Sequence, residues 1–235
     1  MREYIGPSSR FSLPSVHSNR DAVTVLSISP GGAVRIANET EVKDETDYRP
    51  ILEFWFDELE PGDWFKGGEQ VDRAIKNRFE DLLDPVYHGE HDSWLESPEG
   101  RLAAILVLDQ FPRNLYRTDK RMFAYDNRAL RISLEGIARG MDAALEPFQR
   151  VFFYLPLEHS EVMEDQDMSI ERFSHLVTRV RPGQADTFRE YLRYAWRHYE
   201  IIRRFGRYPH RNEILGRTST QKELAFLQQP GSSFL

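Results

Sequence analysis

A chain of 235 residues is long enough to bury one large hydrophobic core or two small ones. Its formal net charge of −7 argues against general nucleic-acid binding, and the absence of cysteine excludes disulfides and thiolate chemistry. No apolar run approaches the roughly 20 residues that a membrane span needs, and no apolar segment of signal-peptide length precedes Pro14. We therefore expect a cytoplasmic protein with no membrane partner and with a nucleic-acid partner disfavoured.

The first 47 residues form an N-terminal arm whose composition differs from the rest of the chain. Residues 22–28 and 33–37 are β-branched and apolar, and Ser29-Pro30-Gly31-Gly32 separates them, so the sequence predicts a β-hairpin extension. A hairpin has exposed edges, and nothing later in the chain offers a sheet to extend. We therefore predict that the hairpin pairs with that of a second copy, giving a homodimer.

From residue 48 the apolar residues recur at helical spacing, which predicts an all-α domain over residues 48–235. Helix starts are indicated at Asp47, which precedes Pro50, at Ser97-Pro98-Glu99, at Ser169 and at Thr220, which forms a capping box with Glu223. The clearest helix covers about residues 184–205, with an apolar face opposite a row of arginines. Short breaks between helices favour an array of antiparallel helix pairs.

Two prolines interrupt apolar helical patterns. Residues 102–108 are apolar on every side and predict a central buried helix, but Pro112 disfavours helix at the residue before it. Pro156 falls within the pattern that starts at Pro147, and a proline inside a regular helix costs about 3 kcal/mol unless the helix bends or ends. We expect a kink or a break near each proline.

Polar residues gather at three places that we expect to be helix ends or kinks. They are Asp109 to Asn114, Glu158 to Glu161, and Arg204 to Asn212. The third lies in a stretch, residues 205–217, where arginines alternate with Gly206, Pro209 and Gly216. Tightly turning backbone that presents cations suits an anion-binding site. We expect the three clusters to converge.

The same motifs carry a family resemblance. DQFPRN at residues 109–114, YLPLEHSE at 154–161 and FGRYPHRN at 205–212, in that order, resemble domain-of-unknown-function family 924, a bacterial family also met in fungi and plants. Phe54-Trp55-Phe56 and Ile214 to Arg217 agree with it. The resemblance covers about residues 48–228. It implies a tetratricopeptide-repeat-like (TPR-like) fold of degenerate helical hairpins, and it brings no activity or catalytic residues.

The favoured interpretation is that the converging clusters bind an anionic ligand, either a phosphorylated or carboxylated small molecule or a peptide terminus. Arg207 and Arg211 would grip the anion, and Asn114 and Asn212 would orient it. The predicted ligand-binding residues are Asp109, Arg113, Asn114, Arg207, His210, Arg211 and Asn212.

Two alternatives stay open. In the first, the protein is a hydrolase-type enzyme in which His159, held by Glu161, is the catalytic acid or base, with or without the assistance of a metal. The sequence lacks HExxH and the carboxylate–histidine spacing of di-iron sites, so we predict no metal site and no cofactor. In the second, Asp109, Glu158 and Glu161 pair with the arginines as a structural clasp without a ligand.

Overall fold

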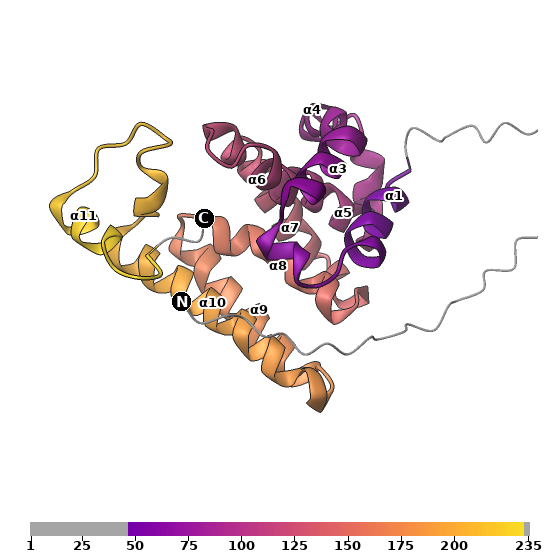
Figure 1. Ribbon diagram of the computed structural model, residues 1–235. Coiled ribbons are helices and arrows are strands. Elements are labelled where there is room, and N and C mark those ends of the chain that lie inside the picture. Colours follow the sequence, from indigo (N-terminus) through magenta and orange to yellow (C-terminus); the bar gives the residue numbers. More distant parts are fainter. Residues whose placement is uncertain (1–46, 233–235) are drawn as a thin grey trace, which may run out of the picture. The chain divides into compact units, whose positions relative to one another are not determined.

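The computed structural model describes residues 47–232, and over this range the chain forms helices and no strand (Figure 1). The all-α prediction is therefore confirmed for this part of the chain. The N-terminal arm, its β-hairpin at residues 22–37 and the homodimer contact assigned to it lie outside the described residues.

The first half of the described chain is built from short helices. The elements are α1 Arg49–Glu53, η1 Phe54–Glu58, α2 Asp63–Lys66, α3 Glu69–Phe79, η2 Glu80–Leu82, α4 Leu83–His88, η3 Asp92–Glu96, α5 Pro98–Ile105, η4 Leu106–Gln110 and α6 Phe111–Leu115. The second half has longer helices and ends in irregular backbone. Its elements are η5 Lys120–Phe123, α7 Asp126–Ala138, η6 Met141–Ala144, α8 Pro147–His159, α9 Met163–Arg179, η7 Pro182–Gln184, α10 Ala185–Phe205, η8 Pro209–Arg211 and α11 Gln221–Leu227.

Helix α5 lies at the centre of the core, as the all-round apolar pattern predicted. Every residue from Leu102 to Leu108 is at most 1% exposed, and α5 packs against α1, α7 and α8. Ser97 caps this helix with its side chain, which accepts a hydrogen bond from the Gly100 amide at 3.0 Å. Pro98 occupies the first turn, where its missing N–H costs nothing.

The break expected before Pro112 does not occur. Instead η4 is a π-helical turn that joins α5 directly to α6, with the Phe111 amide donating to the Leu106 carbonyl. A wider turn absorbs the proline, because the i to i−4 bond that Pro112 cannot make is replaced by a different register. As a result Asp109 and Gln110 point into the core, where they are 0% and 6% exposed.

Pro156 likewise fails to end its helix, since α8 runs unbroken from Pro147 to His159. Pro156 leaves the Phe152 carbonyl without its usual i+4 donor. The carbonyl of the next residue, Phe153, accepts a hydrogen bond of 2.6 Å from Ser133, which ties this turn of α8 to α7. As a result, His159 is the last residue of a long, mostly buried helix.

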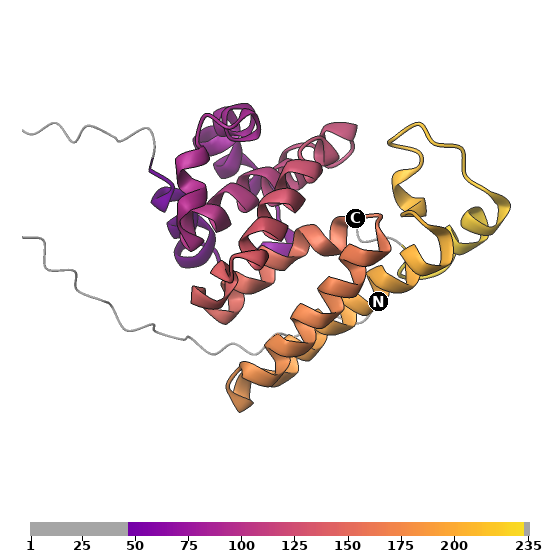
Figure 2. The same cartoon turned by 180° about the vertical axis from the view of Figure 1, so that it is seen from behind.

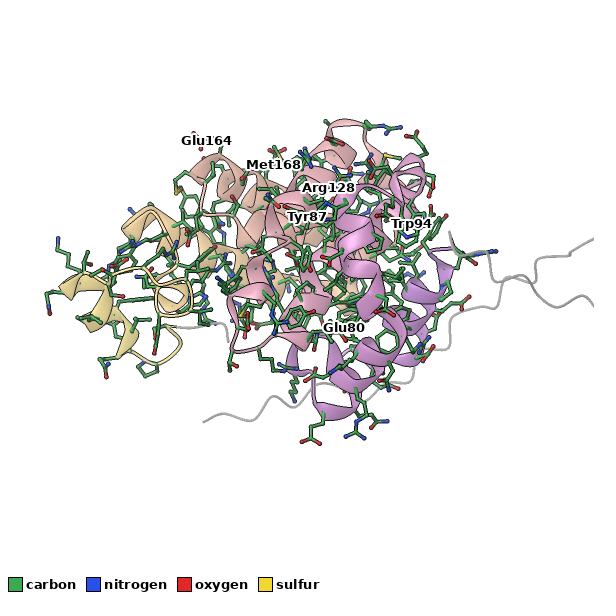
Figure 3. The ribbon with its side chains drawn as sticks, turned by 90° about the horizontal axis from the view of Figure 1, so that it is seen from above. Glu80, Tyr87, Trp94, Arg128, Glu164 and Met168 are labelled. Atoms are coloured by element: carbon green, nitrogen blue, oxygen red, sulfur yellow. The ribbon has the colours of Figure 1, made fainter. Side chains whose placement is uncertain are left out.

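The predicted helix start at Ser169 is wrong. Helix α9 begins at Met163, with Glu164 and Asp165 in its first turn, and Ser169 is buried in its middle. Acidic residues in a first turn are favoured by the helix dipole, and they are a better start signal here than serine. Glu164 lies on the outside of the ribbon (Figure 3).

Helices α9 and α10 pack side by side, and the views from front and back agree on this (Figures 1 and 2). Helix α10 starts one residue later than predicted and ends before Gly206, whose φ of 67° closes the helix in the left-handed conformation.

The capping box that opens α11 is confirmed. The Thr220 amide donates to the Glu223 side chain at 2.6 Å, and the Glu223 amide donates to the Thr220 side chain at 3.3 Å.

None of the helices in residues 47–232 is both long enough and apolar enough to cross a membrane.

The crossing of α5, α7 and α8 depends on Gly136. A Cβ atom there would lie 2.5 Å from Cδ of Arg101 and 2.5 Å from Cζ of Phe153. We predict that Gly136→Ala lowers the free energy of unfolding by about 1–3 kcal/mol, because overpacking outweighs the better helix propensity of alanine. Urea titration measures the change.

The control is Gly62→Ala, where the φ of −69° suits alanine and no atom lies within 4 Å of the new Cβ. Equal stability of the two variants would contradict the close crossing.

Candidate functional site

The three polar segments meet at the C-terminal end of α8. The hydroxyl of Tyr208, a residue with no exposed surface, donates to the carbonyl of Glu158, and the Tyr208 amide donates to Oε1 of Glu161 at 2.8 Å. The segment that follows α10 is therefore fastened onto the last turn of α8, and the expected convergence of these segments is observed.

Gln166 of α9 completes this junction. Its amide nitrogen lies 2.7–3.1 Å from the carbonyl oxygens of Leu157, Glu158 and Ser160, and 3.0 Å from the Tyr208 hydroxyl. The last carbonyls of a helix lack intrahelical partners, so Gln166 stabilises the end that carries His159. We did not predict this residue. Its place on the inward stripe with Ser169 and Phe173 is a signal that the sequence does contain.

His159 is held by Asp109. Its Nδ1 lies 2.7 Å from Oδ1 of Asp109, and Oδ2 of Asp109 accepts from the Gln110 side chain at 2.6 Å. The π-helical turn is what aims Asp109 at α8. Glu161, which we expected to hold His159, instead accepts two bonds from Arg217, at 2.6 and 3.0 Å. The structure corrects the partner of His159 from Glu161 to Asp109.

The electrostatics fix the protonation of this dyad. Burial would raise the pKa of Asp109, but the charge of Arg113 and the contact with His159 hold that pKa well below its ordinary value. Burial lowers the pKa of His159, and the nearby charge of Arg113 lowers it further. At neutral pH the pair is thus a carboxylate and a neutral imidazole whose Nδ1–H donates to Asp109.

The second nitrogen of this imidazole has no hydrogen-bond partner among the described residues. The His159 side chain is 15% exposed, whereas that of Asp109 is fully covered. The dyad therefore has one closed side, at Asp109, and one side from which a proton can enter or leave.

Two arginines share one carboxylate beside the dyad. Arg113 makes a two-bond pair with Asp126 of α7, at 2.9 and 3.1 Å, and lies 3.5 Å from Asp109. Arg211 reaches Asp126 only at 3.5 Å. Asp126 was not among the predicted site residues, because its position in the first turn of α7 is equally typical of a solvated helix start.

Arg211 has an unusual environment for a guanidinium. It is only 8% exposed, its Nε is buried without a partner, and no hydrogen bond from its side chain is formed within residues 47–232. Its Cζ lies 4.6 Å from the ring centre of Phe123 and 4.5 Å from that of Tyr208. Burial lowers the pKa of Arg211, and the charge of Arg113 adds to that effect against the opposing pull of Asp126.

A second acid–histidine pair borders the first. Nδ1 of His198, in α10, lies 3.0 Å from Oε2 of Glu158 and 2.9 Å from the Tyr194 carbonyl. Its ring centre is 6.2 Å from that of His159 and 5.7 Å from that of Tyr208. The structure thus brings the His159 and His198 rings into contact range.

Other predicted site residues form a clasp around the C-terminal segment. Arg207 donates to Glu223 of α11 at 2.6 and 2.9 Å and to the Thr218 carbonyl at 2.9 Å. Asn212 donates to Ser219 at 3.0 Å and accepts from Nε of Arg217 at 2.9 Å. We call this network, built from Glu161, Arg207, Asn212, Arg217 and Glu223, the C-terminal clasp.

Asn114 also lies away from the dyad. It donates to the Gln110 carbonyl at 3.1 Å and accepts from Arg117 at 3.2 Å. It lines an open surface depression of about 450 Å³. The other lining residues are Asp72, Arg73, Lys76, Leu115, Arg117 and Thr118.

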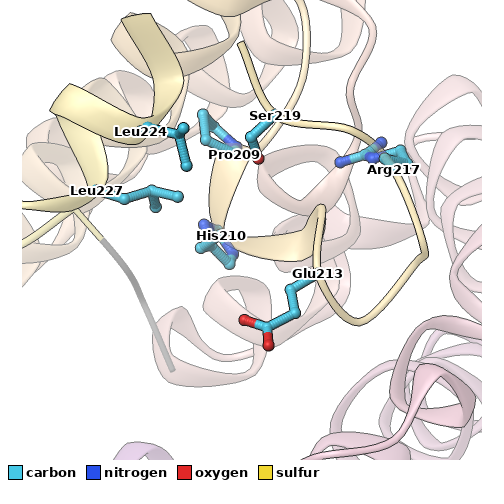
Figure 4. Close-up of a pocket in the computed structure, with 7 residues that line it drawn as sticks. All are labelled: Pro209, His210, Glu213, Arg217, Ser219, Leu224 and Leu227. Atoms are coloured by element: carbon cyan, nitrogen blue, oxygen red, sulfur yellow. The ribbon is translucent and has the colours of Figure 1, made fainter. Parts of the chain in front are cut away.

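His210 lines a different depression, of about 360 Å³ (Figure 4). Its other lining residues are Pro209, Glu213, Arg217, Ser219, Leu224 and Leu227. The His210 ring also lies 5.5 Å from that of Tyr208. Neither depression is lined by His159 or Arg211.

No group of three or more His, Asp or Glu side chains within residues 47–232 is arranged to hold a metal ion.

The comparisons with known proteins agree with the helical fold. The family model described as "Bacterial protein of unknown function (DUF924)" matches residues 51–231. A solved structure, that of the protein of unknown function ATU0120 from Agrobacterium tumefaciens, is 37% identical and superposes with a TM-score of 0.69. The match covers 77% of this chain and 96% of that one. No curated protein matches the chain.

The buried histidines predict how stability depends on pH. Burial lowers the pKa of His210 from 6.5 to about 3, so between these values the unfolded chain binds a proton that the folded chain does not. The free energy of unfolding must then fall as pH falls. We predict a loss of about 1 kcal/mol per pH unit from this group between about pH 6 and pH 4.

Chemical denaturation of the parent chain and of His210→Gln across this range tests the prediction. The variant should lose part of the slope, and His175→Gln, at an exposed site on α9, should keep all of it. An unchanged slope in His210→Gln would show that His210 is protonated in the folded protein.

Proposed function

The chain belongs to the family of bacterial proteins of unknown function (DUF924) that matches residues 51–231, and we propose that its site binds a small anionic ligand. The ligand is a phosphorylated or carboxylated small molecule, or a peptide terminus. The single observation that supports this function is the buried guanidinium of Arg211, which has no hydrogen-bond acceptor within the described chain.

The contrast with neighbouring arginines carries the argument. Arg113, Arg207 and Arg217 each make two bonds to one carboxylate. Arg211 is more buried than Arg207 and has only one distant carboxylate. Nearly all buried donors in proteins are paired, and an unmet charged donor costs more than a neutral one. An anion at Nε would supply the missing acceptor.

Of the predicted site residues, we retain as ligand contacts only those that surround Arg211 and the His159–Asp109 dyad. Asp109, Arg113, His159 and Arg211 are joined through Asp126 and through direct contacts. Asn114, Arg207 and Asn212 already bond protein groups. We therefore assign Arg207 and Asn212 to the structural clasp, which was one of the alternatives from the sequence, and His210 to the wall of the site.

A second candidate function, acid–base catalysis on the bound anion, is favoured by the dyad. A neutral imidazole that donates from Nδ1 to a buried carboxylate presents the lone pair of Nε2, as a general base requires. The hydrolase-type alternative then uses His159 with Asp109 in place of Glu161. If the protein is such an enzyme, His159→Asn leaves ligand affinity nearly intact and abolishes turnover. If the protein only binds its ligand, the substitution changes little.

Three broader proposals accompany the site. We propose that the consecutive packing of α8, α9 and α10 is TPR-like, and that the protein works in the cytoplasm, as its lack of cysteine favours. We also propose that the arm of residues 1–47 mediates a homodimer. Light scattering on the full chain tests the last point, and a monomer would contradict it.

Replacing Arg211 separates a ligand site from a clasp. We predict that Arg211→Met keeps or slightly raises the melting temperature without ligand, because it removes a buried cation that lacks an acceptor. The parent should be stabilised by an anion at 100 times its Kd by about 2.7 kcal/mol, and the variant should not. Thermal-shift measurements with acetate, inorganic phosphate and sulfate report both effects.

The matched control is Arg203→Gln, whose guanidinium is 61% exposed and pairs with Glu200 on the same helix. It should respond to anions as the parent does. If Arg211→Met melts several degrees lower while no anion stabilises the parent, Arg211 belongs to the clasp and the proposed function is wrong.

A further inference from the structure

Resting on that proposed function, we propose that the ligand is a small monocarboxylate bound at the Nε edge of Arg211, and that His159 takes up one proton when it binds. The proposal selects one chemical class from the anions considered above. It depends on the surroundings of the Arg211 guanidinium, on the charge count of the cluster and on the contacts of His159.

The surroundings of Arg211 favour a planar anion. Phe123 and Tyr208 both lie at cation–π distance from its Cζ, and NH1 faces Asp126. Its Nε, at the edge of the guanidinium plane, is buried without an acceptor. A carboxylate matches such an edge with two parallel hydrogen bonds in one plane. Phosphate and sulfate are tetrahedral and would direct further oxygens out of that plane.

The charge count favours a single negative charge. Arg113 and Arg211 contribute two positive charges, and Asp109 and Asp126 contribute two negative ones. The cluster is therefore neutral before a ligand arrives. An ion that is buried without compensation costs several kcal/mol. A monocarboxylate adds one negative charge, and a phosphate dianion adds two.

His159 can offset one added charge. The charged or titratable groups that face it are Asp109 from η4, Arg113 from α6, Asp126 from α7 and His198 from α10. In the empty site, burial and Arg113 keep the imidazole neutral. A carboxylate bound to Arg211 adds a negative charge to this cluster, which opposes the cation field and favours the imidazolium, and the imidazole can take its proton on the open Nε2.

The sign of the pH dependence follows from this linkage. Because the bound anion raises the pKa of His159 above its lowered value in the empty site, the complex binds more protons than the free protein between those two values. Carboxylate affinity must therefore weaken as pH rises through this window. One coupled proton limits the change to about tenfold in Kd per pH unit.

Isothermal titration calorimetry on the full chain tests the proposal with acetate and benzoate against inorganic phosphate and sulfate. Each titration is run in two buffers of different ionisation enthalpy that are neither carboxylates nor phosphates. We expect the carboxylates to bind with an uptake of about one proton, read from the buffer dependence of the enthalpy. Arg211→Met should lose binding. His159→Asn should bind without proton uptake, and His175→Asn should match the parent.

The outcomes are distinct. If phosphate or sulfate binds at Arg211 and the carboxylates do not, the ligand class is wrong and the proposed function stands. Carboxylate binding without proton uptake overturns the role of His159. If none of these anions binds, both this proposal and the proposed function fail. Should His159→Asn not fold, the pH dependence of acetate binding to the parent chain decides, and a Kd that does not rise with pH overturns the proposal.

Discussion

The hydrogen bond from the Tyr208 hydroxyl to the Glu158 carbonyl is the contact on which the site depends. Tyr208 belongs to the backbone after α10, and Glu158 to the last turn of α8, so one buried phenol joins segments fifty residues apart in sequence. Gln166 adds α9 to the same junction. This junction helps to fix the position of the segment that carries Arg211 relative to His159 and Arg113. The C-terminal clasp then holds this segment from the outside through carboxylate–arginine pairs.

The two prolines in apolar helical patterns both help to position this site. Pro112 is accommodated by a π-helical turn, and that turn directs Asp109 toward α8. Pro156 is accommodated inside α8, and the helix therefore extends to His159. Each proline occurs in one of the three sequence motifs, Pro112 in DQFPRN and Pro156 in YLPLEHSE. Two departures from regular helix geometry thus place the carboxylate and the imidazole of one dyad at 2.7 Å from each other.

Much of the fold could be predicted from the sequence, because local signals determine it. Ser97 and Thr220 cap helices through contacts within three residues, and the apolar face of α10 is visible from spacing alone. The site was less predictable, because ion-pair partners are chosen by tertiary packing. Glu161 lies two residues after His159 in the sequence, and Asp109 lies in another of the three motifs, so both are candidate partners of His159. Only the folded chain shows that Glu161 pairs with Arg217 and that Asp109 pairs with His159. Asp126 and Gln166 lie outside the three motifs.

The most direct measurement is a crystal structure of the full chain grown in the presence of acetate. The account predicts a carboxylate with one oxygen about 2.7–3.2 Å from Nε of Arg211, in the plane of the guanidinium. A map in which Nε of Arg211 donates to a protein oxygen, with no anion beside it, would contradict the account. In that case the arginines around Asp126 would form one structural network, and the ligand site would have to be sought elsewhere on the molecule.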